Sequence, residues 1–396
     1  MTGPLANPAF RRLWLADLLS SLGSQVSRIA LILYLFRETG SVAGIALLVA
    51  LETLPGALAA PAAGVLVDRV SRRSAMIAAD LARAALLLVA AVAPAPSALY
   101  LLAALHSVAA AVFQPAQASA VPLAVPAADL PRANGLSQSA ASLVMVAGPL
   151  IGAELFLTAG LVPTLLADAA SFLLSALLVA GARLRPAAGE GAETRPLADL
   201  RAGWRYVSGH GTIRQLLLLF FVSLLCVGLW LPLAPFFIRD FLGGSERVLS
   251  LQLSAFGAGG ALGGLAAPRL VARLGQGGTL LGSLLAEAAL MTAYSAVPRV
   301  AVSIAILFVW GIVVTVAAVP FYSLVQTLVE ERFLGRVFSL LRQSENLALL
   351  LAMGIAVALR GRLSSHWILT AAGGVYLAVV TMVWQAPGGR ALREIR

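Results

Sequence analysis

The chain consists of long apolar runs separated by short polar breaks along almost its whole length. A helix needs about 20 apolar residues to cross a hydrocarbon core about 30 Å thick, and the runs have about that length. They lack the alternation of polar and apolar residues that marks the strands of a membrane barrel. The pattern therefore predicts an all-α membrane protein with twelve transmembrane helices, at 10–36, 42–67, 74–94, 97–121, 135–158, 162–184, 213–240, 248–271, 277–297, 299–325, 335–360 and 364–386.

The longest polar interval, 185–212, divides the chain into two halves. We expect an N-terminal six-helix bundle over 1–184, a cytoplasmic central loop over 185–212, a C-terminal six-helix bundle over 213–386 and a cytoplasmic tail over 387–396. Within the loop, Leu197, Leu200, Trp204 and Val207 would share one face of a short helix on the inner membrane surface. A solvated linker is the alternative interpretation.

The two halves resemble each other as internal repeats. Residues 56–83 align with 260–287 at an offset of 204, which places Gly56 on Gly260 and Arg69 on Arg273. Two parallel repeats about an axis along the membrane normal are typical of one large class of secondary transporters. Prolines and glycines inside the apolar runs, including the cluster GAGGALGG at 257–264, favour helices that kink and approach closely. We therefore expect two pseudo-symmetric bundles.

The amino-acid composition supports a membrane protein and argues against nucleic acid as a partner. The mean hydropathy is +0.92 and 60% of the residues are hydrophobic, which excludes a soluble nucleic-acid-binding protein despite a net charge of +10. Because about 19 of the arginines fall on one side of the predicted helices, that side is the cytoplasm and both termini lie there. The expected location is a bacterial-type inner membrane. Cys226, the single cysteine, offers no disulfide, and we expect no cofactor, no metal and no enzyme activity.

Ionisable residues inside the spans mark the candidate functional positions, since each costs about 2.5–3.5 kcal/mol or more to insert. The spacing of Asp80 with Arg83 and of Arg342 with Glu345 predicts ion pairs on one helix face, most simply structural ones. Arg28 and Glu52 lie almost equally far from the turn near Gly40, so we expect them to meet near the midplane. The other acids in the spans are Asp17, Glu154, Asp168 and Glu287. We expect Asp168 and Glu287 to be structural or to reach locally toward the membrane surface.

The segment GVLVDRVSRR, Gly64 to Arg73, follows the pattern G-x-x-x-D-R-x-x-R-R between the second and third spans. This loop resembles the signature of the major facilitator superfamily. The stretches FRRLWLADLLSSLGS, FQPAQASAVPLAVPAADLPRANGL, AGPLIGA and GRVFSLL resemble its drug-efflux branch, which includes macrolide efflux pumps and the enterobactin exporter. The resemblance implies a cytoplasmic latch made by Gly64, Asp68, Arg69, Arg72 and Arg73, with Gly64 allowing close helix contact. Its expected gate partners on the eleventh helix are Arg336, Arg342 and Glu345.

The resemblance also implies that the first, fourth, seventh and tenth helices line a substrate cavity. Asp17 is then a candidate proton or cation site, with a gate role for Asp17 as the alternative, and Glu154 follows a motif associated with antiporters. The candidates for proton coupling and substrate binding are thus Asp17, Arg28, Glu52 and Glu154. The chain departs from the family in its fourth helix, where His106 and Gln114 stand without the buried arginine of many proton antiporters.

These observations predict a monomeric transporter that works by alternating access and exports hydrophobic or amphipathic small molecules in exchange for protons. A carboxylate in a low-dielectric site can take up a proton on one side and release it on the other. The apolar and aromatic residues of the cavity helices suit such cargo better than sugars. The alternatives are a siderophore or lysophospholipid transporter of the same fold and, from a different class, a non-transporting membrane receptor or scaffold.

Overall fold

The computed structural model describes residues 4–126, 129–182, 204–385 and Leu392, and within these ranges it leaves undescribed the side chains of Val65, Asp68, Arg69, Pro131, Glu331 and Arg332. The described chain is helical, and twelve of its helical segments are long and apolar enough to cross a membrane, which confirms the predicted fold class. The helices are α1 (Pro8–Thr39), α2 (Val42–Arg69), α3 (Arg72–Val92), α4 (Pro96–Ala124), α5 (Leu130–Ala159), α6 (Leu161–Gly181), α8 (Gly211–Gly228), α9 (Trp230–Asp240), α10 (Arg247–Leu274), α11 (Gln276–Ala296), α12 (Val300–Leu328), α13 (Glu331–Arg360) and α14 (Ser365–Gln385).

Polar residues at the breaks determine where the first helices begin. The side chains of Asn7, Ser41 and Ser71 accept hydrogen bonds from backbone N–H groups in the first turns of α1, α2 and α3. These caps satisfy donors that have no partner inside the helix. Gly40 ends α1 in the left-handed conformation, with φ of 55°, which costs glycine little because it has no β-carbon. The short polar breaks in the sequence are therefore specific helix starts and stops.

The seventh span differs from the single helix predicted over 213–240. It consists of α8 and α9, which meet at Leu229. The break comes three residues before Pro232, whose ring nitrogen cannot donate to the carbonyl of Gly228. Leu229 N–H instead donates to the carbonyl of Cys226 over 3.3 Å, a tighter turn than that of an α-helix. Pro232 thus interrupts this span.

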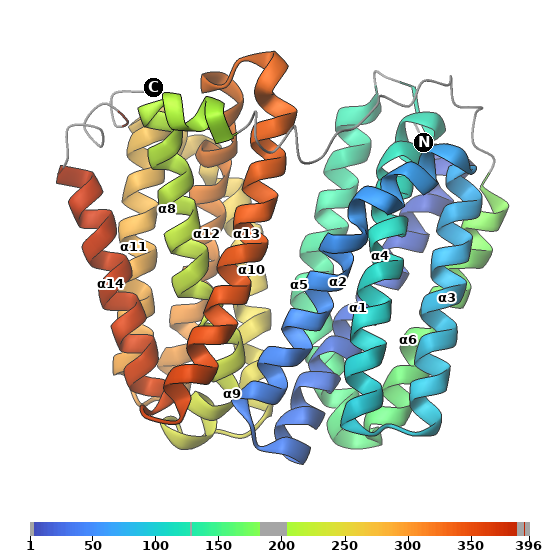
Figure 1. Ribbon diagram of the computed structural model, residues 1–396, viewed down its shortest axis with the longest axis horizontal. Coiled ribbons are helices and arrows are strands. Elements are labelled where there is room, and N and C mark those ends of the chain that lie inside the picture. Colours follow the sequence, from blue (N-terminus) through green and yellow to red (C-terminus); the bar gives the residue numbers. More distant parts are fainter. Residues whose placement is uncertain (1–3, 127–128, 183–203, 386–391, 393–396) are drawn as a thin grey trace. The chain divides into compact units, whose positions relative to one another are not determined.

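The chain forms two compact units, Met1–Glu193 and Thr194–Arg396. Figure 1 colours the helices of the first unit from blue to green and those of the second from yellow-green to red. Three pairs of helices have bounds that are 204 residues apart at both ends: α3 with α11, α4 with α12, and α6 with α14. This offset is the one found in the sequence alignment, so equivalent residues of the two repeats can be named directly.

Close helix packing in the second unit depends on the glycine cluster of α10. A β-carbon built on Gly259 would overlap the carbonyl oxygen of Phe308 in α12, and one built on Gly311 in α12 would overlap the carbonyl oxygen of Phe256. Small residues at such a contact let two helix backbones approach in lipid, where the hydrophobic effect does not drive helix association. The close approach predicted from GAGGALGG is confirmed for α10 and α12.

The predicted interfacial helix lies mostly outside the described residues, since Leu197 and Leu200 fall in the range 183–203. Residues 204–209 are helical. Trp204 is exposed while Val207 is buried, so these two residues do not share an environment.

Candidate functional site

A cleft of about 460 Å³ opens in the first unit. It is lined by polar side chains of α1, by Arg83 of α3, by His106, Phe113 and two glutamines of α4, and by small and apolar residues of α5. We call it the N-bundle cleft. Its lining is defined by Asp17, Leu18, Ser20, Ser21, Ser24, Gln25, Arg83, His106, Ala110, Phe113, Gln114, Gln117, Ala140, Ala141, Val144 and Met145. The α1 and α4 helices, expected to line the cavity, both contribute.

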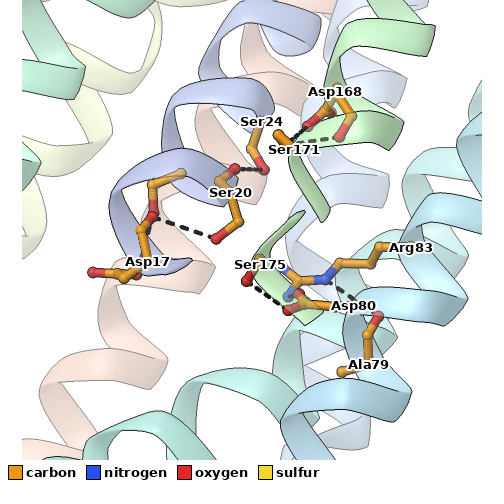
Figure 2. A network of polar contacts seen from close by, with 10 residues as sticks. Asp17, Ser20, Ser24, Ala79, Asp80, Arg83, Asp168, Ser171 and Ser175 are labelled. Atoms are coloured by element: carbon orange, nitrogen blue, oxygen red, sulfur yellow. Dashed lines mark hydrogen bonds and ion pairs between the residues drawn. The ribbon is translucent and has the colours of Figure 1, made fainter. Parts of the chain in front are cut away.

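A buried ion pair lies beside the cleft. Arg83 pairs with Asp80 one turn earlier on α3, as the spacing predicts, and the two residues are 6% and 0% exposed. The second carboxylate oxygen of Asp80 accepts a hydrogen bond of 2.7 Å from Ser175 Oγ of α6. Figure 2 shows Asp80 between Arg83 and Ser175. The carboxylate is therefore held by partners on two helices, as a charge buried in lipid requires.

Two aromatic rings hold the guanidinium of Arg83. Its Cζ atom lies 4.4 Å from the ring centroid of Phe113 in α4 and 4.2 Å from that of Phe172 in α6. A cation over an aromatic face is attracted by the ring quadrupole, and the attraction grows when water is absent. His106 of α4 packs edge-on against Phe172, with centroids 5.5 Å apart. The arginine is thus fixed by groups from three helices.

A second buried acid, Asp168 of α6, lies completely inside the first unit. It accepts hydrogen bonds from Ser27 of α1 and, over 3.2 Å, from Ser171 of its own helix. Asp168 and Asp17 both interact electrostatically with Arg83. Of the two expectations for Asp168, a structural position agrees with these contacts and reach toward the membrane surface does not, because its partners hold it in the interior. Three carboxylates and one guanidinium therefore share this region.

Asp17 is half-buried and faces the N-bundle cleft. Ser21 Oγ donates to its carboxylate over 3.4 Å, and Ser20 Oγ donates to its backbone carbonyl over 3.3 Å. Ser24 Oγ in turn donates to the carbonyl of Ser20 over 2.8 Å, a chain that Figure 2 shows along α1. Such bonds to carbonyls of the preceding turn satisfy hydroxyl groups inside a span. Of the acids near the cleft, Asp17 alone is among the residues that line it.

The predicted pair of Arg28 and Glu52 is present. Arg28 Nε of α1 lies 3.0 Å from Glu52 Oε2 of α2, and the two side chains are 38% and 22% exposed. Neither residue lines the N-bundle cleft. Glu154 lies exposed on α5, also outside that lining. The structure therefore brings two of the four coupling candidates into one ion pair, apart from Asp17.

The signature loop is described in part. Arg73 donates to the carbonyl of Ala180 and Arg12 to that of Gly181, so two arginines meet the C-terminal carbonyls of α6. Arg72 begins α3. The side chains of Asp68 and Arg69 lie outside the described residues, and a β-carbon on Gly64 would meet no described atom within 4 Å. The close contact expected at Gly64 is therefore not seen within this bundle, and Arg73 bonds to its own bundle.

The expected gate partners lie on α13. Arg342 and Glu345 form the predicted pair, with 3.6 Å between Nη1 and Oε2. The Cζ atom of Arg336 lies 5.6 Å from the ring centroid of Phe333.

The sequence predicts Arg83 as a structural partner of Asp80, and the fourth helix lacks the buried arginine that the family resemblance implies. The structure supplies that buried charge from the third helix, against His106 and Phe113 of the fourth. The signal available in the sequence is the arginine itself, since a cation in a span must face the interior. What could not be predicted was which neighbouring helix it would reach.

Two six-helix repeats, each with charges buried among its helices, define a multi-pass membrane protein of the secondary-transporter type. Residues 13–353 match the family model described as Major Facilitator Superfamily, and the chain belongs to this superfamily of transporters.

Three known proteins illustrate the relationship. Macrolide efflux protein A of Streptococcus pyogenes is 28% identical over 385 residues, with 91% of each chain covered. Multidrug efflux pump Tap of Mycobacterium tuberculosis is 27% identical over 350 residues, covering 83% of this chain and 81% of the pump. The crystal structure of the nucleoside transporter NupG superposes with a TM-score of 0.73 at 14% identity, covering 98% of this chain and 100% of that one. The last likeness concerns the fold alone.

Proposed function

We propose that this protein exports hydrophobic or amphipathic small molecules across a bacterial inner membrane in exchange for protons. It works by alternating access as a monomer, with both termini in the cytoplasm. The efflux relatives support a small-molecule cargo and an outward direction. The excess of arginine on one side of the spans supports the orientation.

The observation that carries proton coupling is the charge balance around the N-bundle cleft. Asp80 pairs with Arg83, Asp17 lines the same cleft as Arg83, and Asp168 lies one turn before Phe172, whose ring packs against the guanidinium. Three carboxylates beside one guanidinium leave an excess of two negative charges when all are ionised, and a low-dielectric environment opposes such an excess. Taking up protons relieves it. Because Asp17 lines the cleft while Asp80 and Asp168 are wholly buried, Asp17 is the acid that solvent and cargo reach.

Transport by purified protein in proteoliposomes under an imposed pH gradient tests this function. The panel contains lipophilic dyes, macrolides, a siderophore and lysophospholipids, so that it also separates the alternative cargoes. We expect the gradient to drive at least one amphipathic compound and its collapse to stop that flux. A panel in which no flux responds to the gradient would remove proton exchange from the proposal.

Asp17→Asn should abolish the gradient-driven flux while leaving the folded protein intact, because the amide cannot exchange a proton at the cleft. Glu38→Gln is the matched control, since Glu38 is an exposed acid near the end of the same helix. Glu52→Gln tests the second candidate by breaking the pair with Arg28. Wild-type pH response in both Asp17→Asn and Glu52→Gln would show that neither residue carries the proton.

The signature loop is proposed as a latch that holds the cytoplasmic side closed when the cavity faces out. Asp68 lies in the last turn of α2, where the helix dipole disfavours a carboxylate and favours arginines nearby. Asp68→Asn should therefore slow turnover at saturating cargo several-fold while changing the dissociation constant of the cargo little. Equal losses in binding and turnover would contradict a latch.

A further inference from the structure

The second unit contains a smaller cavity of about 250 Å³. We call it the C-bundle cavity, and the residues that matter here are Phe220 and Ser223 of α8, Glu287 of α11, Phe321 and Tyr322 of α12, and Glu345 of α13. Its other lining residues are mainly aliphatic. An apolar cavity with one buried acid is a different chemical environment from the polar N-bundle cleft.

Glu287 is held in place by three neutral donors on three other helices. Tyr376 Oη of α14 donates to Oε2 over 2.6 Å, Trp310 Nε1 of α12 donates to Oε1 over 3.2 Å, and Ser223 Oγ of α8 lies 3.3 Å from Oε2. The residue is 3% exposed. Indole N–H is a donor only, so Trp310 requires an oxygen that accepts. The three contacts fix the carboxyl group as an acceptor in the interior. Of the two expectations for Glu287, they agree with a structural position and not with reach toward the membrane surface.

Within the described part of the chain, no arginine or histidine forms an ion pair with Glu287. Two other acids of the spans differ in this respect, since Asp80 pairs with Arg83 and Glu345 with Arg342. A buried carboxylate without a counter-charge is costly unless a proton or another cation joins it. The cavity beside Glu287 is the space from which such a cation can approach.

The internal repeat shows that this arrangement inverts the charge of the first unit. At the offset of 204, Arg83 corresponds to Glu287, His106 to Trp310 and Phe172 to Tyr376. The neighbours change with the charge. Around Arg83 they present an aromatic face, and around Glu287 they present N–H and O–H donors. Each repeat thus carries one buried charge at the same position, with surroundings matched to its sign.

The walls of the C-bundle cavity also favour a cation. Phe220 and Phe321 stack with centroids 4.6 Å apart, and Tyr322 packs edge-on against Phe321 at 5.3 Å. Aromatic faces attract organic cations such as quaternary ammonium groups, most strongly when water is excluded. These rings supply that attraction together with an apolar surface for the remainder of the ligand.

We infer that the C-bundle cavity binds the positively charged end of a lipophilic amine or quaternary ammonium compound, with Glu287 as counter-charge and Phe220 and Phe321 as walls. The inference rests on the proposed function in that the ligand would be part of the exported cargo. The volume of about 250 Å³ is below the roughly 300–1,000 Å³ of pockets that enclose drug-sized ligands, so it holds a head group and one ring.

Binding of benzyltrimethylammonium to the full-length protein in nanodiscs tests the inference by equilibrium dialysis. Its permanent charge removes any dependence on ligand protonation, and neopentylbenzene has the same shape without the charge. After correction for partitioning into empty nanodiscs, we expect the wild-type protein to bind the cation at least tenfold more tightly than the neutral compound. Equal binding of the two would overturn the inference without any variant.

Glu287→Gln should weaken binding of the cation at least tenfold and leave the neutral compound unchanged. Asp240→Asn is the matched control, because Asp240 is an exposed acid of the same unit outside the cavity. If Glu287→Gln fails to fold, Phe321→Ala keeps the carboxylate and should weaken binding about threefold or more. If the Glu287→Gln protein folds and binds the cation as tightly as the wild-type protein, Glu287 has a purely structural role and the inference is overturned.

The binding experiment and the transport assay can fail separately, so failure of the cation site can be distinguished from failure of the proposed function. Binding that requires Glu287 in a protein without gradient-driven flux would support the cation site and contradict proton exchange. Gradient-driven flux of neutral compounds by a protein that does not bind the cation would support proton exchange and contradict the cation site.

Discussion

At the scale of single residues, the first unit shows how a charge is tolerated in lipid. Arg83 and Asp80 neutralise each other on one helix. Ser175 donates a hydrogen bond to the carboxylate, and the rings of Phe113 and Phe172 pack against the guanidinium, so two other helices also contact the pair. The i, i+3 spacing was enough to predict the pair. The aromatic contacts were not predictable, because they depend on how α4 and α6 are rotated about their axes, which hydropathy does not specify.

The buried Asp80–Arg83 pair should contribute far more to the free energy of unfolding than the exposed Arg342–Glu345 pair. Arg83→Met leaves Asp80 buried without its cation and should lower the free energy of unfolding by about 3–5 kcal/mol. Adding Asp80→Asn to Arg83→Met should recover most of that loss, since no uncompensated charge remains. Denaturant unfolding of the purified protein, followed by tryptophan fluorescence, measures both.

Arg342→Met supplies the comparison for that experiment. The Arg342–Glu345 pair has side chains that are 68% and 42% exposed, so its loss should cost less than about 1 kcal/mol. Equal losses for Arg83→Met and Arg342→Met would mean that burial does not determine the value of the pair.

At the scale of helices, breaks and close contacts follow from proline and glycine. Pro232 divides the seventh span, and glycines bring α10 and α12 together. The sequence indicated that helices could bend and approach, but it did not predict that one span would divide. In lipid a proline can kink a helix or end it, depending on whether neighbouring groups satisfy the freed carbonyl.

Gly311→Ala should destabilise the second unit by at least about 1 kcal/mol, because the new methyl group meets the backbone oxygen of Phe256, which cannot move without displacing α10. Gly282→Ala in α11 is the control, since its β-carbon meets no described atom within 4 Å. That change should be neutral or stabilise by up to about 1 kcal/mol through helix propensity. The thermal unfolding midpoint should therefore fall for Gly311→Ala and stay unchanged or rise for Gly282→Ala.

At the scale of the whole molecule, the even number of candidate spans in the described residues supports the proposal that both termini lie on one side of the membrane. The distribution of arginine in the sequence supports the proposal that this side is the cytoplasm. The repeat could be recognised from a short alignment and was recovered in the helix bounds. The exchange of a buried cation for a buried anion at equivalent positions of the two repeats could not be recognised from the sequence. Arg83 and Glu287 align only as a mismatch, and the side chains that surround each of them are known only from the structure.

Cysteine accessibility tests the orientation. In a Cys226→Ser background, Ala272→Cys at the end of α10 should react with a membrane-impermeant maleimide only from the cytoplasmic side. Ala95→Cys between α3 and α4 should react only from the opposite side. The reverse pattern in intact cells would invert the topology.

The ion pair on α3 also has a consequence for biosynthesis. Helices enter the membrane in order of translation, and α6 follows α3 by roughly 70 residues or more, so Ser175 and Phe172 do not exist when Asp80 and Arg83 are inserted. Each charge alone would oppose insertion by about 2.5–3.5 kcal/mol. Because Asp80 and Arg83 can pair within one turn of the same helix, their charges can neutralise each other before α3 leaves the translocon. The contacts with α6 can then form later.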